Sequence, residues 1–162
     1  AAAHAPSKNQ TYIRIEGFDK SVLYRSEKLQ AHLKKFGEAQ VVEKSQSESL
    51  WSKIRDVDVF SDKTSDIWRL SVKPTAAPEI VSAIGFHQYL YDWSGGLIWG
   101  ALPQGSDPRL ALAKFGGHAT RIRGKSGRVP RFQPQTKLIA ELSEKIRCKF
   151  DPKGVLNTGL MV

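Results

Sequence analysis

The residues of this chain that are best suited to binding an anion are three arginines: Arg69, Arg121 and Arg123. Arg69 lies at the centre of an apolar run, where an unpaired guanidinium would be costly. It predicts an anion anchor that holds a carboxylate in bidentate geometry, or else a structural ion pair or a solvent-facing side chain. Arg121 and Arg123 are two residues apart, which predicts that they share one strand face. That face would bind a carboxylate, a phosphate or an acidic partner, or it would be a solvated surface.

His118 is the histidine that we consider for acid–base chemistry, because an imidazole exchanges a proton near neutral pH. It follows two glycines, so the alternative is a turn or core histidine whose ring nitrogens are satisfied by hydrogen bonds. The other histidines are scattered, and the sequence has no metal-ligand spacing, no dinucleotide-binding glycine pattern and no nucleophile motif. The sequence therefore predicts no metal site, and it gives no support to covalent hydrolase chemistry.

Two strands must position these side chains. Residues 66–72 predict a strand that carries Arg69 and stops before Pro74. Residues 118–123 predict a second strand, which carries His118 and the other two arginines.

A hairpin signal at Ser94–Gly96 predicts that two further strands pair with each other. Trp93 and Trp99 flank the hairpin, and we expect both to be core residues because an indole carries a large apolar area. The other expected elements are strands at 11–16, 38–43, 86–93 and 97–102, a helix starting near 45, and helices at 20–36, 77–84, 107–115 and 135–149.

This order of elements predicts an α+β fold: a mainly antiparallel sheet with helices packed on one face, ferredoxin-like in arrangement. The similar patterns of the two halves suggest an internal duplication. We expect three parts: a linker remnant at 1–10, an α+β domain at 11–134, and a C-terminal helix and tail at 135–162.

Composition and charge narrow the classes of function. The 162 residues contain no run of 18 apolar residues, which predicts no membrane span. Cys148 is the single cysteine, so a disulfide framework is excluded; we expect an inert thiol and a reducing compartment. Residues 109–153 hold 12 Lys/Arg and 3 Asp/Glu, which accounts for the whole net charge of +9. Such a field attracts anions or an acidic partner, or it is a solubility feature.

Five segments spread over almost the whole chain resemble one enzyme family. The segments are FDPKGVLNTGLMV at 150–162, WRLSVKPT at 68–75, YDWSGGLIW at 91–99, GHAT at 117–120 and AAHAP at 2–6. They resemble flavin-linked oxidases of the vanillyl-alcohol-oxidase type, and within them the smaller FAD-binding subunit of bacterial glycolate oxidase. One departure is Thr158, where that family usually has proline.

The resemblance implies that 11–134 is the cap domain of an FAD-dependent 2-hydroxy-acid (glycolate) oxidase subunit and covers the flavin ring. FAD is then expected in the full-length protein and absent from this fragment, because we find no pyrophosphate cradle; the fragment alone would be inactive. The implied partners are the larger flavin subunit, the iron–sulfur subunit and a small 2-hydroxy acid. The implied location is the cytoplasm, with peripheral attachment to the inner face of the cytoplasmic membrane through the partners.

The resemblance also implies roles for single residues. Arg69 would hold the substrate carboxylate toward the flavin, and His118 would act as a base near the substrate α-carbon. Asn157 and Gly159 would contact the flavin-binding domain, or they would form a helix-end turn.

Two other functions remain open at this point. The chain would be a non-catalytic assembly module if its basic third docks on an acidic partner surface. A ferredoxin-like sheet with a charge of +9 could also bind nucleic acid, although the aromatic and basic pattern of RNA-binding sheets is missing. We expect no nucleic-acid partner.

Overall fold

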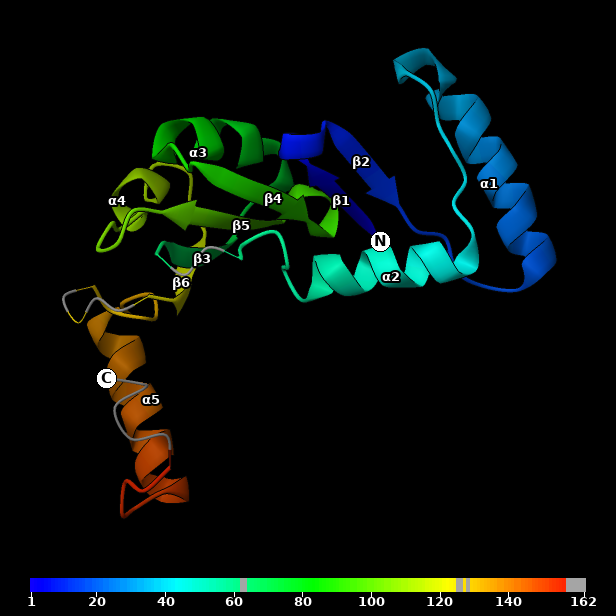
Figure 1. The fold of residues 1–162 in the computed structure, drawn as a ribbon. Coiled ribbons are helices and arrows are strands. Elements are labelled where there is room, and N and C mark those ends of the chain that lie inside the picture. The colour runs from blue at the N-terminus through cyan, green and yellow to red at the C-terminus, as the bar shows by residue number, and fades with distance from the viewer. Residues whose placement is uncertain (62–63, 125–126, 128, 157–162) are drawn as a thin grey trace.

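The computed structural model describes residues 1–61, 64–124, 127 and 129–156. At its centre lies a six-stranded antiparallel sheet in the order β2-β1-β4-β5-β3-β6 (Figure 1). The strands are β1 (Ala2–Ala5), β2 (Gln10–Ile13), β3 (Asp66–Ser71), β4 (Gln88–Asp92), β5 (Leu97–Leu102) and β6 (His118–Arg123). The helices are α1 (Asp19–Leu33), α2 (Lys44–Arg55), α3 (Ala77–Ile84), α4 (Arg109–Leu112) and α5 (Lys137–Phe150). The fold is α+β, as the sequence predicted.

The region from β3 to β6 has the ferredoxin-like order of elements. It runs β3-α3-β4-β5-α4-β6, which is the β-α-β-β-α-β arrangement, and both of its helices lie on the same side of the sheet (Figure 1). The described elements before Asp66 are a hairpin followed by two helices. Their order differs from that of the second half, so it gives no support to an internal duplication.

One face of the sheet, which we call the closed face, carries the main core beneath α3 and α4. Trp68 and Leu70 of β3 are fully buried there, together with Ile80 of α3 and Leu112 of α4. Burial of side chains of this size contributes roughly 1.5–3 kcal/mol each. The strands alternate strictly enough to send every second side chain into this layer, and that fixes the direction of the intervening ones.

The intervening side chains form the opposite face, which we call the open face. At one end α2 covers it, where Ile54 packs with Ile67, Leu90 and Ala101. The helices are therefore divided between the two faces, with α3 and α4 on one and α2 on the other. Toward β3 and β6 the open face holds half-buried or exposed side chains: Arg69, Ser71, Trp99, His118 and Thr120.

The N-terminal residues are part of the sheet, so the linker predicted at 1–10 is wrong. β1 pairs with β2 and also with β4, where His4 lies opposite Tyr91. Little in the sequence indicates this strand, because AAHA contains no β-branched residue and no Phe, Tyr or Trp. The strand predicted at 38–43 does not form. Among the described residues no strand lies beside that segment, and its Ala39 oxygen accepts a 3.4 Å hydrogen bond from Nε2 of Gln30.

α1 and α5 extend away from the sheet (Figure 1), and neither contains a buried residue. α1 starts at Asp19, one residue before the expected bound, and Phe18 in front of it is 90% exposed. On α5 the apolar side chains of Leu138, Leu142 and Ile146 are exposed as well. Beyond α5, the Asp151 carboxylate accepts hydrogen bonds from the amides of Leu156 (2.8 Å) and Val155 (3.0 Å). These bonds hold the pKa of Asp151 below its usual range.

Candidate functional site

Arg69 occupies the middle of the open face between two tryptophans. Its guanidinium carbon lies 5.2 Å from the ring centre of Trp93 and 6.0 Å from that of Trp99. Trp99 is its direct partner on β5, and Thr120 is its partner on β6. Within the described part of the chain, no group accepts a hydrogen bond from Arg69 or forms an ion pair with it. The side chain is therefore held in place by aromatic contacts while its five donors remain available.

Trp93 reaches this position from a strained turn. Its φ is 50°, and Ser94 follows with a φ of 55°, in the left-handed region that costs an L-residue about 1 kcal/mol. Asp92 holds the turn, because its Oδ1 accepts a hydrogen bond of 2.7 Å from the Trp93 amide. The turn directs the indole outward, and Trp93 is 62% exposed. The expectation that Trp93 is a core residue is wrong for this reason; Trp99 is half-buried.

A cavity of about 320 Å³ adjoins Arg69, and we call it the tryptophan pocket. Its lining residues are Ala1, Trp51, Ile54, Arg55, Arg69, Asp92, Trp93, Leu97 and Trp99.

The charged side chains that line the tryptophan pocket differ in whether they already have ion-pair or hydrogen-bond partners. Arg55 makes a two-bonded pair with Asp56, with distances of 2.7 and 2.9 Å. These hydrogen bonds raise the pKa of Arg55 and lower that of Asp56. One carboxylate oxygen of Asp92 already accepts the hydrogen bond from the Trp93 amide in the turn. Of the two arginines that line the pocket, Arg69 is thus the one that no described carboxylate neutralises.

His118 lies on the same face as Arg69. It pairs with Ser71, and the neighbouring pair on that face is Thr120 with Arg69. His118 and Arg69 are therefore diagonal neighbours, which in antiparallel pairs lie roughly 7–8 Å apart. The His118 side chain is exposed, and it does not line the tryptophan pocket. The glycine before it is required: at Gly117 φ is 105°, and a Cβ would approach the Ser71 carbonyl oxygen to 2.5 Å.

Arg121 and Arg123 do not share a face. Trp68 pairs with Arg121 and the adjacent Ile67 pairs with Arg123, so Ile122 is the extra residue of a β-bulge. Arg121 points to the closed face, where its Nη1 lies 3.7 Å from the Oδ2 of buried Asp66.

Arg123 points to the other face, and its Nη2 donates a 2.8 Å hydrogen bond to the oxygen of Phe60. The simple alternation used for the sequence prediction of Arg121 and Arg123 fails at this one inserted residue. Both arginines make contacts within the protein, and their role in binding an anion stays a prediction.

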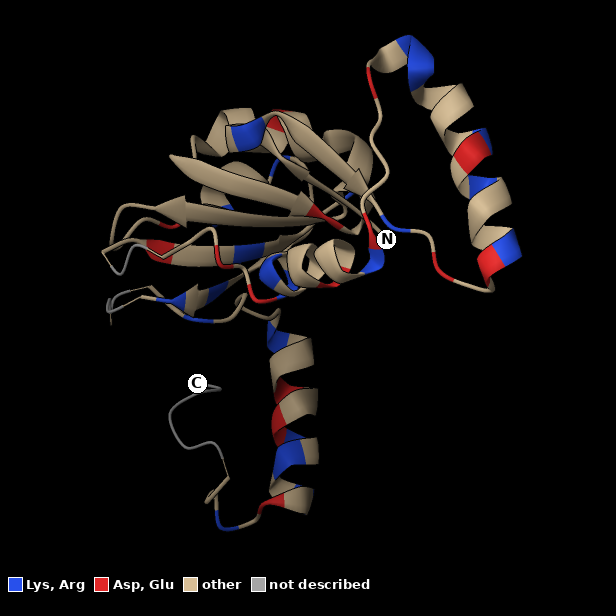
Figure 2. Ribbon diagram, turned by 45° about the vertical axis from the view of Figure 1, so that its right-hand side comes forward, with Lys and Arg blue, Asp and Glu red and all other residues tan. Residues whose placement is uncertain are grey.

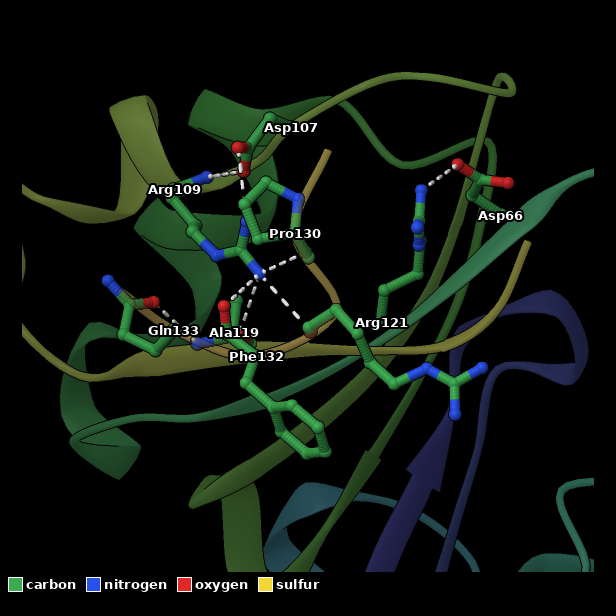
Figure 3. A network of polar contacts seen from close by, with 9 residues as sticks. Asp66, Asp107, Arg109, Ala119, Arg121, Pro130, Phe132 and Gln133 are labelled. Carbon is green, nitrogen blue, oxygen red and sulfur yellow. Dashed lines mark hydrogen bonds and ion pairs between the residues drawn. The ribbon is translucent and has the colours of Figure 1, made fainter. Parts of the chain in front are cut away.

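Arg109, which the sequence did not single out, is a buried cation with several acceptors around its guanidinium (Figure 3). It is 8% exposed, and its guanidinium carbon lies 4.7 Å from the ring centre of Trp68. Asp107 pairs with its Nη1 at 3.2 Å. Its Nη2 donates to the carbonyl oxygens of Pro130 (2.8 Å) and Phe132 (2.9 Å), with longer contacts to those of Ala119 and Arg131. Nothing in the local sequence signals that this arginine is buried.

The contacts of Arg109 fasten residues 130–133 along the outer edge of β6 (Figure 3). There the Arg121 amide donates to the Arg131 oxygen at 2.8 Å, and the Ala119 amide donates to Oε1 of Gln133 at 3.2 Å. Part of the basic third is therefore internal structure. α5 carries both signs of charge, with Glu141 and Glu144 in its middle and Lys145, Arg147 and Lys149 toward its end (Figure 2).

Several expectations fall outside this geometry. Asn157 and Gly159 lie outside the described residues, and their contact with a flavin-binding domain stays a prediction. Within the described ranges, no group of three potential metal ligands comes together. No helix in that same part of the chain has the length and apolar character needed to cross a membrane.

Comparison of the chain with protein-family models, with curated proteins and with solved structures found no match.

Proposed function

We propose that this chain is the cap domain of an FAD-dependent 2-hydroxy-acid oxidase subunit of the glycolate oxidase type. The observation that carries the proposal is Arg69: a guanidinium held between two indoles on the open face, with no described acceptor. A bidentate arginine of this kind is suited to a substrate carboxylate. The segments that resemble that oxidase family contain Arg69, Trp93, Trp99 and His118.

The chain's own residues would bind and orient the substrate. Arg69 would hold the carboxylate, and His118, on the same face, would accept a proton from the bound hydroxy acid. The sequence offers no glycine-rich phosphate cradle, so these residues do not fit the FAD pyrophosphate, and a separate domain would hold it. The larger flavin subunit and the iron–sulfur subunit are the proposed partners, in a cytoplasmic complex at the inner membrane face.

The test uses the complete oxidase complex with Arg69→Ala, Arg69→Lys and His118→Gln. Loss of a charged, bidentate contact removes roughly 1.5–3 kcal/mol, so Arg69→Ala should raise KM about 10- to 100-fold, with Arg69→Lys between it and wild type. His118→Gln should lower kcat by about 100-fold or more. Lys114→Ala, an exposed residue away from the open face, is the matched control. Unchanged kinetics in all three variants would refute the proposal.

A second candidate, a non-catalytic assembly module, is favoured by the exposed apolar side chains of α5. Leu138, Leu142 and Ile146 are 48–67% exposed and share one stripe, which has no partner among the described residues. Leu142→Asp should then release the subunit from the complex in size-exclusion chromatography, while Glu141→Gln should not. Normal turnover of the Arg69 and His118 variants, combined with disassembly of Leu142→Asp, would favour this second role.

A further inference from the structure

We infer that the tryptophan pocket takes a monocarboxylate with an apolar, preferably aromatic, body, in preference to a two-carbon acid. The inference rests on the proposed function where turnover is concerned, since it names the class of 2-hydroxy acid that the oxidase would accept. Binding to this chain can be tested independently.

The size and walls of the tryptophan pocket favour a ligand with an apolar body. A volume of about 320 Å³ lies at the lower end of the roughly 300–1,000 Å³ typical of small-molecule sites. Half-buried Trp51 of α2 and Trp99 of β5 supply apolar surface on the same face, while Ile54 and Leu97, which also line the pocket, are almost fully buried. A two-carbon acid bound at Arg69 would leave most of this apolar surface in contact with water, whereas a larger body would cover it.

The charges around the pocket favour a ligand with a single carboxylate. Arg69 has no acceptor among the described residues, so one anionic group would complete its hydrogen bonding. Asp92 also lines the pocket, and its carboxylate would repel a second negative group. Arg55 is already paired with Asp56 and the Ala1 ammonium already donates to the Arg14 oxygen, so neither cation fully offsets that repulsion. A dicarboxylate or a phosphate ester should therefore bind less well than a monocarboxylate.

The indoles favour an aromatic body over an aliphatic one. Aromatic pairs prefer offset-stacked or edge-to-face contacts, which are worth up to about a tenfold gain in affinity beyond the area that they bury. Trp93 is held over Arg69 by a left-handed backbone although it is 62% exposed, so it gains little from burial in the free protein. A bound ring would cover this exposed indole.

The 162-residue chain itself is titrated with 3-phenyllactate, followed by tryptophan fluorescence and calorimetry. Glycolate tests the apolar body, 2-phenylethanol tests the carboxylate, and phenylsuccinate tests the second charge. We expect 3-phenyllactate to bind at least about tenfold more tightly than each of these three. The inference would be overturned if glycolate bound as tightly as 3-phenyllactate. It would also be overturned if 3-phenyllactate did not bind at about 10 mM, which is tenfold above the usual range of KM values.

Variants locate the binding. Arg69→Gln should weaken 3-phenyllactate about 10- to 100-fold, Arg69→Lys should weaken it less, and Trp93→Ala should remove most of the preference for an aromatic ring. Lys53→Gln on α2, which is exposed and outside the pocket lining, is the matched control. Circular dichroism checks the fold of each variant, and Arg69→Lys keeps the test valid if Arg69→Gln is unfolded. Binding that is unaffected by Arg69→Lys and Trp93→Ala would refute the site.

The two proposals fail in different ways. If the chain binds 3-phenyllactate through Arg69 but the complex oxidises no 2-hydroxy acid, the proposed function fails and the ligand class stands. If the complex depends on Arg69 but oxidises glycolate more efficiently than 3-phenyllactate, the ligand class fails and the proposed function stands.

Discussion

Two arginines stack on tryptophans on opposite faces of the sheet at β3, and they differ in the number of groups that accept hydrogen bonds from them. Arg109 covers Trp68 on the closed face, where Asp107 and the carbonyl groups of residues 130–132 surround its guanidinium. Arg69, the next residue after Trp68, points to the open face and meets Trp93 and Trp99 without an acceptor. An arginine surrounded by acceptors holds a structure together, whereas one kept in place by rings alone is prepared for an external anion.

The largest effect is expected for Arg109→Ala. Its removal leaves several carbonyl groups and Asp107 without their partner and releases residues 130–133, so we expect a loss of about 3 kcal/mol in the free energy of unfolding. Urea denaturation followed by circular dichroism measures it. Lys114→Ala, which is exposed nearby, should change stability by less than about 0.5 kcal/mol. A loss below about 1 kcal/mol for Arg109→Ala would show that Arg109 is not the structural residue that this comparison requires.

Gly100→Ala tests how tightly the closed face is packed. A Cβ at this position would overlap the ring of Phe86, which is buried in the core, so we expect a loss of about 2 kcal/mol through overpacking. Gly85→Ala is the matched control, because its φ of 73° strains an alanine although no atom lies within 4 Å of the added Cβ. That variant should lose about 1 kcal/mol. Similar thermal stability for the two variants would show that backbone strain, not packing, limits this face.

Asp92→Ala sharpens the open side of the comparison. It removes the acceptor that holds the Trp93 amide in the strained turn, so we expect a loss of about 1 kcal/mol or less. The indole of Trp93 should then leave Arg69, and tryptophan emission should shift. Asp92→Asn, which keeps an acceptor oxygen, should retain most of the wild-type spectrum. An unchanged spectrum for Asp92→Ala would mean that the turn does not depend on this hydrogen bond.

The smallest effect on stability is expected for Arg69→Ala. Two cation–π contacts at a partly exposed site are offset by regained side-chain freedom, so the loss should be about 0.5 kcal/mol. Its ratio to the effect of Arg109→Ala is the direct measure of the contrast between the faces. If Arg69→Ala destabilises the chain as much as Arg109→Ala, Arg69 is a structural residue and the comparison fails.

Local sequence patterns predicted the elements that carry the site. The strand containing Arg69, the hairpin at Ser94–Gly96 and the helix at 77–84 all form within a few residues of the expected bounds. Their signals are local: alternation, a glycine turn, and a proline in the first helical turn. The α+β class followed from their order.

The relations between strands could not be read in the same way. That His118 and Arg69 share a face depends on the register of β3 with β6, which no local pattern encodes. The bulge at Ile122 separates Arg121 from Arg123 although their spacing predicted the opposite. The burial of Arg109 depends on carbonyl groups more than twenty residues away, and the segment 38–43 has strand-like residues but no neighbour to pair with.

Residues 130–133, which Arg109 fastens along β6, form a strap that also affects how copies of this chain can associate. Residues 130–133 take up outward-facing amides of β6, while β2, at the other end of the sheet, has no further strand beside it in the part of the chain that the structure describes. Molecules with a single bare edge can join edge to edge only in pairs, because each junction uses up the edge of both members. Molecules with two bare edges can stack without limit. Loss of the strap in Arg109→Ala would thus expose a second sheet edge, and association through both edges can continue into fibres. The buried guanidinium of Arg109 therefore also helps to keep the protein soluble.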